Sequence, residues 1–183
     1  MINSKVILID TLNASQGVAL TVLVAAEAAR RGFTLDEIIS LAEKSAKYTF
    51  SIFAVDTLEF LQKNGRIGKA ASLVGSLLQL KPILYANEEG TVGVYDKVRG
   101  RTKIVPTLVA AAQERVPCDK PVNLSVVHCD AEDHARELAD ELMKHYEVVD
   151  FHFGPVGPTI GTHIGPGAIS LMIQPSFDTL IAL

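Results

Sequence analysis

Short apolar runs alternate along this chain with longer segments of helical periodicity, and this alternation restricts the fold to a few classes. The runs that predict strands are residues 5–10, 48–55, 82–86, 91–98, 122–129, 146–153 and 168–173. Helices are predicted over residues 15–32, from Thr34 onward, over 56–80 with a break at Asn64-Gly65, over 100–116 and after Asp130. Such alternation is typical of an α/β protein, and we predict a mixed sheet.

Local signals refine three of these helices. Thr34 and Glu37 have the spacing of a capping box, which predicts a helix that begins at the next residue. Apolar residues occupy almost every position from 18 to 26, which predicts a helix buried on all sides. Asp130 follows a predicted strand and is expected to cap the helix after it.

The composition narrows the classes of partner. The chain has 183 residues, 48% of them hydrophobic, and a net charge of −4. This charge disfavours nucleic acid and anionic membranes as partners, and no apolar run approaches the ~20 residues that a membrane span needs. The N-terminal residues resemble a strand rather than a signal peptide, and Cys118 and Cys129 fit free thiols in a reducing compartment. We therefore expect a cytoplasmic protein with apolar surface to spare for a ligand.

Residues 154–167 surround one histidine, His163, with five glycines and three prolines. Glycine permits positive φ and close backbone approach, whereas proline fixes φ, so the shape of this segment is closely specified. We predict a loop that something approaches closely at Thr162 and His163. The alternative is a polar turn whose histidine is solvated or bonded to the backbone.

Residues 13–17, Asn-Ala-Ser-Gln-Gly, lie between a predicted strand and a predicted helix. Ligands of open α/β sheets bind beyond the carboxyl ends of strands, and helix N-termini attract anions. The Ser15 hydroxyl could therefore bind a carboxylate or phosphate, or it could simply cap its own helix. A nucleophile and base formed by Ser15 and His163 is a further alternative, although no G-x-S-x-G motif surrounds Ser15 and only Asp10 could orient the base.

Two other clusters carry candidate chemistry. The basic run over residues 97–103 is either a solvated surface or a docking site for an acidic partner or a phosphate. A second, metal-like cluster consists of His128, Cys129, Asp130 and His134. Its spacing matches no zinc pattern, so we predict no metal site.

Several segments together resemble the DegV family of bacterial fatty-acid-binding proteins. They are "VILIDTLNASQG", "FAVDTLEFLQKNGRIGKAASLVGSLLQLKPIL", "DKVRGRTK" and "GTHIGPGA", in the order of the family and over nearly the whole chain. The resemblance implies two α/β lobes with a long-chain fatty acid between them, the first lobe at residues 1–48 and the second at 49–183.

The resemblance also implies roles for individual residues. Ser15 and His163, with Thr162 beside it, would hold the carboxylate of the fatty acid, and the acyl tail would lie in an apolar tunnel. The protein would do no chemistry and need no cofactor; it would present the acid to a separate ATP-dependent fatty acid kinase that forms an acyl phosphate. Arg99 and Arg101 match the basic segment near that docking face, and Arg66 matches a family position without a clear role.

The sequence departs from the family pattern at its start. Family members usually carry a further N-terminal segment with a Thr-Ser-Gln-Pro-Ser-like motif, whose threonine also contacts the carboxylate. Nothing in this chain matches it, so we expect the first lobe to be incomplete. Exposed apolar faces and an unpaired sheet edge would then favour a homo-oligomer or a partner chain.

Overall fold

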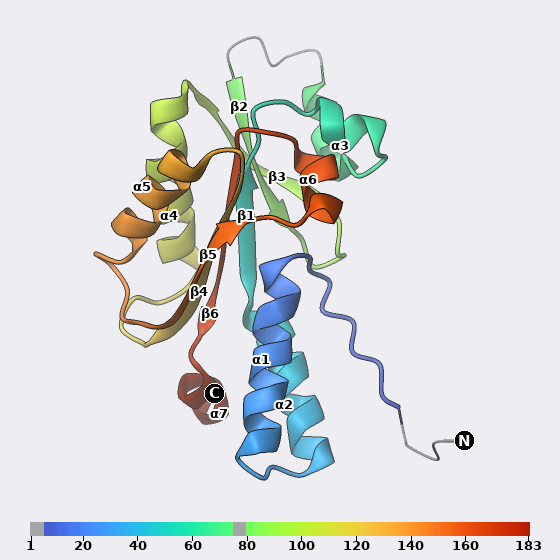
Figure 1. Cartoon of the computed structure of the whole chain (residues 1–183), viewed down its shortest axis with the longest axis vertical. Coiled ribbons are helices and arrows are strands. Elements are labelled where there is room, and N and C mark those ends of the chain that lie inside the picture. Colours follow the sequence, from blue (N-terminus) through green and yellow to red (C-terminus); the bar gives the residue numbers. More distant parts are fainter. Residues whose placement is uncertain (1–5, 75–79) are drawn as a thin grey trace.

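The computed structural model describes residues 6–74 and 80–183, and the six strands within these ranges form one mixed sheet (Figure 1). The strands are β1 Phe50–Ala54, β2 Leu80–Ala86, β3 Val92–Arg99, β4 Val122–Cys129, β5 Val148–Pro155 and β6 Ala168–Pro175, in the order β3-β2-β1-β6-β4-β5. Strands β4 and β5 pair in parallel, and every other neighbouring pair is antiparallel. The predicted mixed sheet and the hairpin of β2 and β3 are confirmed.

Helices cover both faces of the sheet (Figure 1). They are α1 Gln16–Arg30, α2 Leu35–Tyr48, α3 Glu59–Lys63, α4 Ile104–Arg115, α5 Glu132–Leu142, α6 Pro158–Ile164 and α7 Phe177–Ala182, with 3₁₀ turns η1 Gly68–Leu73 and η2 Arg101–Lys103. Helices α4 and α5 pack on one face, whereas α3, η1 and α6 cover the other. Among the described residues, no helix combines the length and apolar character that a membrane span requires.

The two faces follow from the period of two along each strand. In β4, Leu124 and Val126 contribute to the core beneath α4 and α5, while Val127 faces the opposite side. In β6, Leu171 belongs to the first core and Met172 to the second face. The second face therefore carries both the apolar packing of α3 and α6 and the contact with α1.

Helices α1 and α2 form a pair that packs with α7 at one end of the sheet (Figure 1). A buried polar network joins this pair to β6: the Ser45 and Thr49 hydroxyls donate to Gln174 Oε1 at 2.7 and 2.8 Å. Gln174 is fully buried, at 0% exposure. Because buried polar groups are costly to leave unpaired, these bonds specify where α2 sits against the sheet. The division into lobes at residues 48 and 49 stays a prediction.

Two sequence predictions about the N-terminal part are wrong. Residues 6–10 form no strand, and Val6 and Leu8 are 88% and 93% exposed, because no strand among the described residues lies beside them to pair with. Helix α1 is not buried on all sides, since Val22 and Leu23 are 58% and 53% exposed. Helix α1 has more apolar side chains than α2, α7 and the sheet can cover, so some of them stay exposed. The predicted capping box at Thr34 is confirmed.

Three further differences concern the ends of strands. The glycine- and proline-rich segment is not a continuous loop, because residues 158–164 form α6. Asp130 does not cap α5: the N-cap is Ala131, without a side-chain bond, and Asp130 turns with a φ of 51°. The break at Asn64-Gly65 is confirmed, but the second predicted helix is the 3₁₀ turn η1, and its remainder over 75–79 lies outside the described residues.

Replacing Ser45 with alanine should lower the free energy of unfolding by about 1 kcal/mol, because the variant loses a buried hydrogen bond to Gln174. Ser40, exposed in the same helix, provides the matched control: Ser40→Ala gains the same helix propensity without losing a buried bond. Urea unfolding measures both variants. Equal midpoints for the two would show that the network does not stabilise the fold.

Candidate functional site

A cavity of about 350 Å³ opens on the second face of the sheet. It lies between the sheet, α3, α6, the hairpin turn and the start of α1. Most of its wall is aliphatic or aromatic and comes from Phe53, Leu61, Val127, Val156, Ile160 and Met172. Such a lining, with a few polar groups among apolar ones, is typical of sites for small ligands.

The room for this cavity comes from the pairing of large with small side chains. In the ladder between β1 and β6, Ser51 lies opposite Met172 and Phe53 lies opposite Ser170. All four residues line the cavity. Because each large side chain faces a serine, the two strands leave space that two large side chains would have filled.

Ser15 lines the cavity from the start of α1. It is the N-cap residue, yet its side chain makes no capping hydrogen bond, and its backbone has φ 53° and ψ −130°. Positive φ is uncommon for residues other than glycine and is concentrated at functional sites. The capping interpretation of Ser15 is therefore wrong, and its hydroxyl is free of its own helix.

His163 lines the same cavity from the last turn of α6. Its Nδ1 atom is buried and has no hydrogen-bond partner among the described residues. Thr159 and Ile160, about one helical turn earlier, also line the cavity. The structure thus brings together Ser15 and His163, which are far apart in the sequence.

Thr162 lies elsewhere on α6. Its hydroxyl donates to the Pro158 carbonyl at 2.8 Å, and its own carbonyl accepts a bond from Asn64 Nδ2 at 3.0 Å. It is not among the residues that line the cavity. A role for Thr162 in binding stays a prediction, although its hydroxyl already has a partner within the helix.

Two glycines after α6 explain the unusual composition of this segment. Gly165 and Gly167 have φ of 73° and 85°. A Cβ atom at Gly165 would lie 2.3 Å from the Phe60 ring, and one at Gly167 would lie 2.2 Å from the Asp56 carboxylate. The segment that follows β1 therefore approaches closely at these two positions, whereas an approach at Thr162 and His163 stays a prediction.

The predicted cationic residues occupy two places. Arg66 lines the cavity, whereas Arg99 and Arg101 are exposed at the end of β3 and in η2. Strands β1, β3, β4 and β5 run in the same direction, so the two exposed arginines lie at the same end of the sheet as the start of α6, but beside the opposite edge strand. Burial lowers the pKa of His134 in α5, and the Arg101 charge lowers it further, which places Arg101 near α5.

Of the metal-like cluster of His128, Cys129, Asp130 and His134, the structure shows His128 packed among other side chains. His128 is buried against the Phe153 ring, with ring centroids 5.7 Å apart. Burial raises the pKa of the Cys129 thiol. Within residues 6–74 and 80–183, no three His, Cys, Asp or Glu side chains converge as metal ligands would.

Sequence reasoning missed several polar residues that line the cavity: Asn13, Ser51, Thr159 and Ser170. Ser51 and Ser170 lie within predicted strands, and their position in the cavity depends on a register that the sequence does not reveal. Thr159 could have been found from helical spacing, because residues 159, 160, 163 and 164 all line the cavity.

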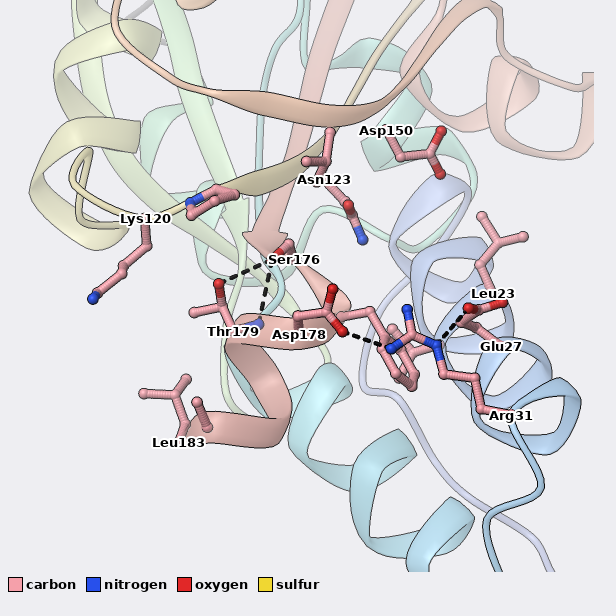
Figure 2. Close-up of a pocket in the computed structure, with 15 residues that line it drawn as sticks. Leu23, Glu27, Arg31, Lys120, Asn123, Asp150, Ser176, Asp178, Thr179 and Leu183 are labelled. Carbon is pink, nitrogen blue, oxygen red and sulfur yellow. Dashed lines mark hydrogen bonds and ion pairs between the residues drawn. The ribbon is translucent and has the colours of Figure 1, made fainter.

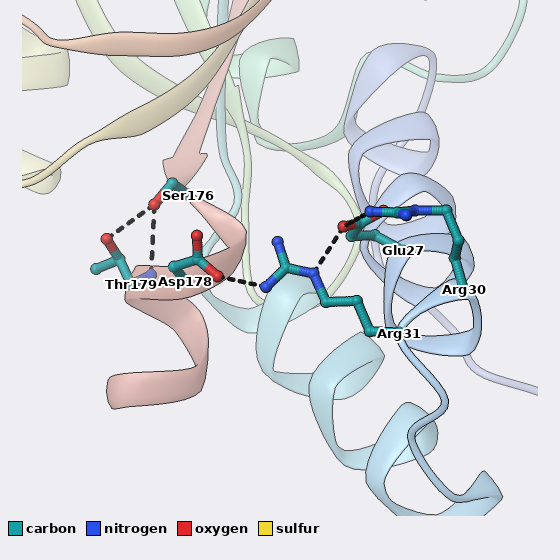
Figure 3. A network of polar contacts seen from close by, with 6 residues as sticks. All are labelled: Glu27, Arg30, Arg31, Ser176, Asp178 and Thr179. Atoms are coloured by element: carbon teal, nitrogen blue, oxygen red, sulfur yellow. Dashed lines mark hydrogen bonds and ion pairs between the residues drawn. The ribbon is translucent and has the colours of Figure 1, made fainter.

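A larger groove, of about 910 Å³, lies at the opposite end of α1 (Figure 2). Three of its charged side chains pair with one another. Arg31 donates to Glu27 at 2.7 Å and to Asp178 at 2.6 Å (Figure 3). Its guanidinium lies 4.3 Å from the centre of the Phe177 ring. Because these charges are paired and tie α7 to α1, we regard the smaller cavity with the unpartnered His163 as the candidate site.

The sequence matches a known family over almost all of its length. Residues 1–176 match the family model described as "Uncharacterised protein, DegV family". The chain belongs to the DegV family. The resemblance predicted from the sequence motifs is therefore confirmed, as is the α/β fold of the family.

Individual DegV proteins give the extent of the similarity. A DegV domain-containing protein of Streptomyces coelicolor is 38% identical, over 91% of this chain and 59% of that protein. A protein of Thermotoga maritima named fatty acid-binding protein is 35% identical, over 94% of this chain and 60% of its own length. The solved structure of a fatty-acid-binding DegV protein from Thermus thermophilus matches with a TM-score of 0.90 at 30% identity, over 95% of this chain and 62% of that one. The chain thus spans about three fifths of these relatives.

The groove at α7 predicts a pH dependence of stability. Hydrogen bonds from Arg30 and then Arg31 lower the pKa of Glu27 from 4.5 to about 2. A carboxyl whose pKa is lower in the folded state stabilises the fold above its unfolded pKa and loses that contribution as the pH falls. Wild-type protein should therefore lose more stability between pH 4.5 and 2 than Glu27→Gln.

Urea midpoints at a series of pH values across this range measure the effect. Glu43→Gln, at an exposed glutamate of α2, is the control and should follow the wild type. Parallel curves for wild type and Glu27→Gln would show that the Glu27 pairs are too screened by solvent to matter.

Proposed function

We propose that this chain binds a long-chain fatty acid in the 350 Å³ cavity, with Ser15 and His163 at its carboxylate. The observation that carries the proposal is the meeting of these two side chains in one apolar cavity, where the His163 Nδ1 atom has no partner among the described residues. The relatives named as fatty-acid-binding proteins support the ligand class.

The polar groups fit an acid head group. A carboxylate removed from water needs hydrogen bonds or an opposite charge in compensation. The Ser15 hydroxyl and a protonated His163 nitrogen could donate to it, and Arg66 adds a positive charge to the cavity lining. Thr162 contributes to this site only if its hydroxyl leaves the Pro158 carbonyl.

The apolar wall fits an acyl tail. Each buried CH₂ group contributes about 0.8 kcal/mol to binding. Phe53, Val127 and Met172 provide such a wall on the sheet side, and Leu61 and Ile160 provide it on the helix side. The tail would extend along the second face of the sheet, beneath α3 and α6.

One observation favours a second candidate function, ester hydrolysis or acyl transfer by Ser15 with His163 as base. Ser15 adopts a strained backbone at the entrance to a helix, as nucleophilic serines of hydrolases do. Against it, Asp10 does not line this cavity, and its carboxylate accepts a bond from the Leu12 amide at 2.9 Å. Within residues 6–74 and 80–183, no carboxylate residue lines the cavity to orient His163.

The double variant Ser15→Ala and His163→Ala should bind a fluorescent fatty acid at least tenfold more weakly than wild type, because the carboxylate loses both hydrogen-bond donors. Titration of purified, delipidated protein measures the affinity. Thr162→Ala, in the same helix as His163, is the matched control and should change affinity much less.

Unchanged affinity in the double variant would sink the assignment of the head group. Turnover of a p-nitrophenyl ester by wild type that Ser15→Ala abolishes would instead support the second candidate function. Failure of wild type to bind any fatty acid would reject fatty-acid binding by this chain.

The proposal extends to a partner, an ATP-dependent fatty acid kinase that phosphorylates the bound acid. Arg99 and Arg101 are exposed at the same end of the sheet as the start of α6, on the side of the opposite edge strand. A partner docked there would have to reach across this end of the sheet to the residues proposed to hold the carboxylate. An acidic docking surface on that partner would be attracted by both charges.

Reversing both charges, with Arg99→Glu and Arg101→Glu, should weaken acyl phosphate formation by a purified kinase of this class at least tenfold, and more at low salt than at high salt. Fatty-acid affinity should stay within twofold of wild type, because neither arginine lines the cavity. Lys120→Glu combined with Lys144→Glu, at two exposed lysines elsewhere, is the control that changes the net charge equally. Equal loss in the control would exclude a specific docking site.

A further inference from the structure

Asn13 borders the candidate site two residues before Ser15, and its side chain is held in one orientation. Its Oδ1 atom accepts a bond from the Ser51 hydroxyl at 2.8 Å and from the Ala14 amide at 3.0 Å. A flipped amide would turn its NH₂ group toward the Ala14 N–H, where two donors would face each other. The carbonyl end of the side chain is therefore committed to the protein.

Gly17 permits this position. A Cβ atom there would lie 2.1 Å from Asn13 Oδ1 and 2.4 Å from its Cγ, closer than any side chain tolerates. Gly17 does not have a positive φ. Glycine is therefore needed at this position because a side chain would not fit, and not because of the backbone conformation. The absence of a side chain at Gly17 lets the Asn13 amide lie against the first turn of α1.

The other end of the amide is unused. Among the described residues, Asn13 Nδ2 donates no hydrogen bond, although Asn13 lines the cavity beside Ser15 and on the same wall as Ser51. Its two N–H groups are the donors that an anionic head group needs once it leaves water.

We infer that Asn13 is a further head-group residue, whose NH₂ group donates to the carboxylate of the bound acid while Ser51 and Gly17 position it. The inference rests on the proposed function, since it names a third donor at the same site. It also assigns a role to Ser51, whose hydroxyl would act through Asn13 rather than on the ligand.

The decisive variant is Asn13→Asp. An aspartate keeps the size of the side chain and both bonds accepted by Oδ1, but it replaces the NH₂ donor with a negatively charged oxygen. We expect its affinity for a fluorescent fatty acid to fall about 10- to 100-fold, because a charged hydrogen bond becomes a repulsion. Affinity for the fatty alcohol of the same chain length, which carries no charge, should change less than about threefold.

Gly17→Ala provides a second variant that favours helix formation yet displaces the Asn13 amide. It should weaken acid binding while leaving the urea midpoint at or above that of wild type. Equal losses for acid and alcohol in Asn13→Asp would mean that Asn13 only shapes the cavity, and would overturn the inference. Unchanged acid affinity would mean that the Asn13 amide faces the neighbouring pocket, which Asp10 and Glu43 also line, instead of the carboxylate. That result would overturn the inference too. In both cases wild-type binding would leave the proposed function standing.

Discussion

The rest of the structure depends on the insertion of β6 between β1 and β4. This strand is the last in the described sequence, yet it lies in the middle of the sheet, and every residue of it is buried. Until β6 pairs with both neighbours, the strands β1, β2 and β3 are not connected by hydrogen bonds to the pair β4 and β5. Because contacts between distant segments cost loop-closure entropy, this arrangement makes completion of the sheet a late and cooperative step.

The candidate site also depends on β6, because both helices that carry its residues contact this strand. Helix α6, with His163, leads directly into β6, and the turn between them is held against Asp56 and Phe60. Helix α1, with Ser15 at its start, packs on β6 at Met172, and its Thr21 hydroxyl accepts a bond from Ser45, which also donates to Gln174 of β6. The head-group residues proposed here therefore meet only because one strand contacts both of the helices that carry them.

The sequence predicted most elements, and its failures have physical causes. Apolar runs predicted every described strand, but the run at 5–10 failed because a strand also needs a neighbour to pair with. Glycine and proline suggested a loop at 154–167, although Pro158 at the start of α6 and Gly165 after its end are themselves helix boundary signals. Motifs found Ser15 and His163. Asn13 and Ser51 could not be assigned, because their roles depend on a hydrogen bond between residues 38 positions apart.

The pairing of Ser51 with Met172 and of Phe53 with Ser170 has a consequence for how such proteins diversify. Each serine is a place where one nucleotide change can add or remove volume beneath the proposed acyl chain without altering the backbone ladder. Relatives could thus acquire preferences for shorter, longer or bent acyl chains through substitutions at strand positions that leave the architecture intact. The backbone of the sheet would then stay the same, while the side chains that line the cavity on the sheet side would vary.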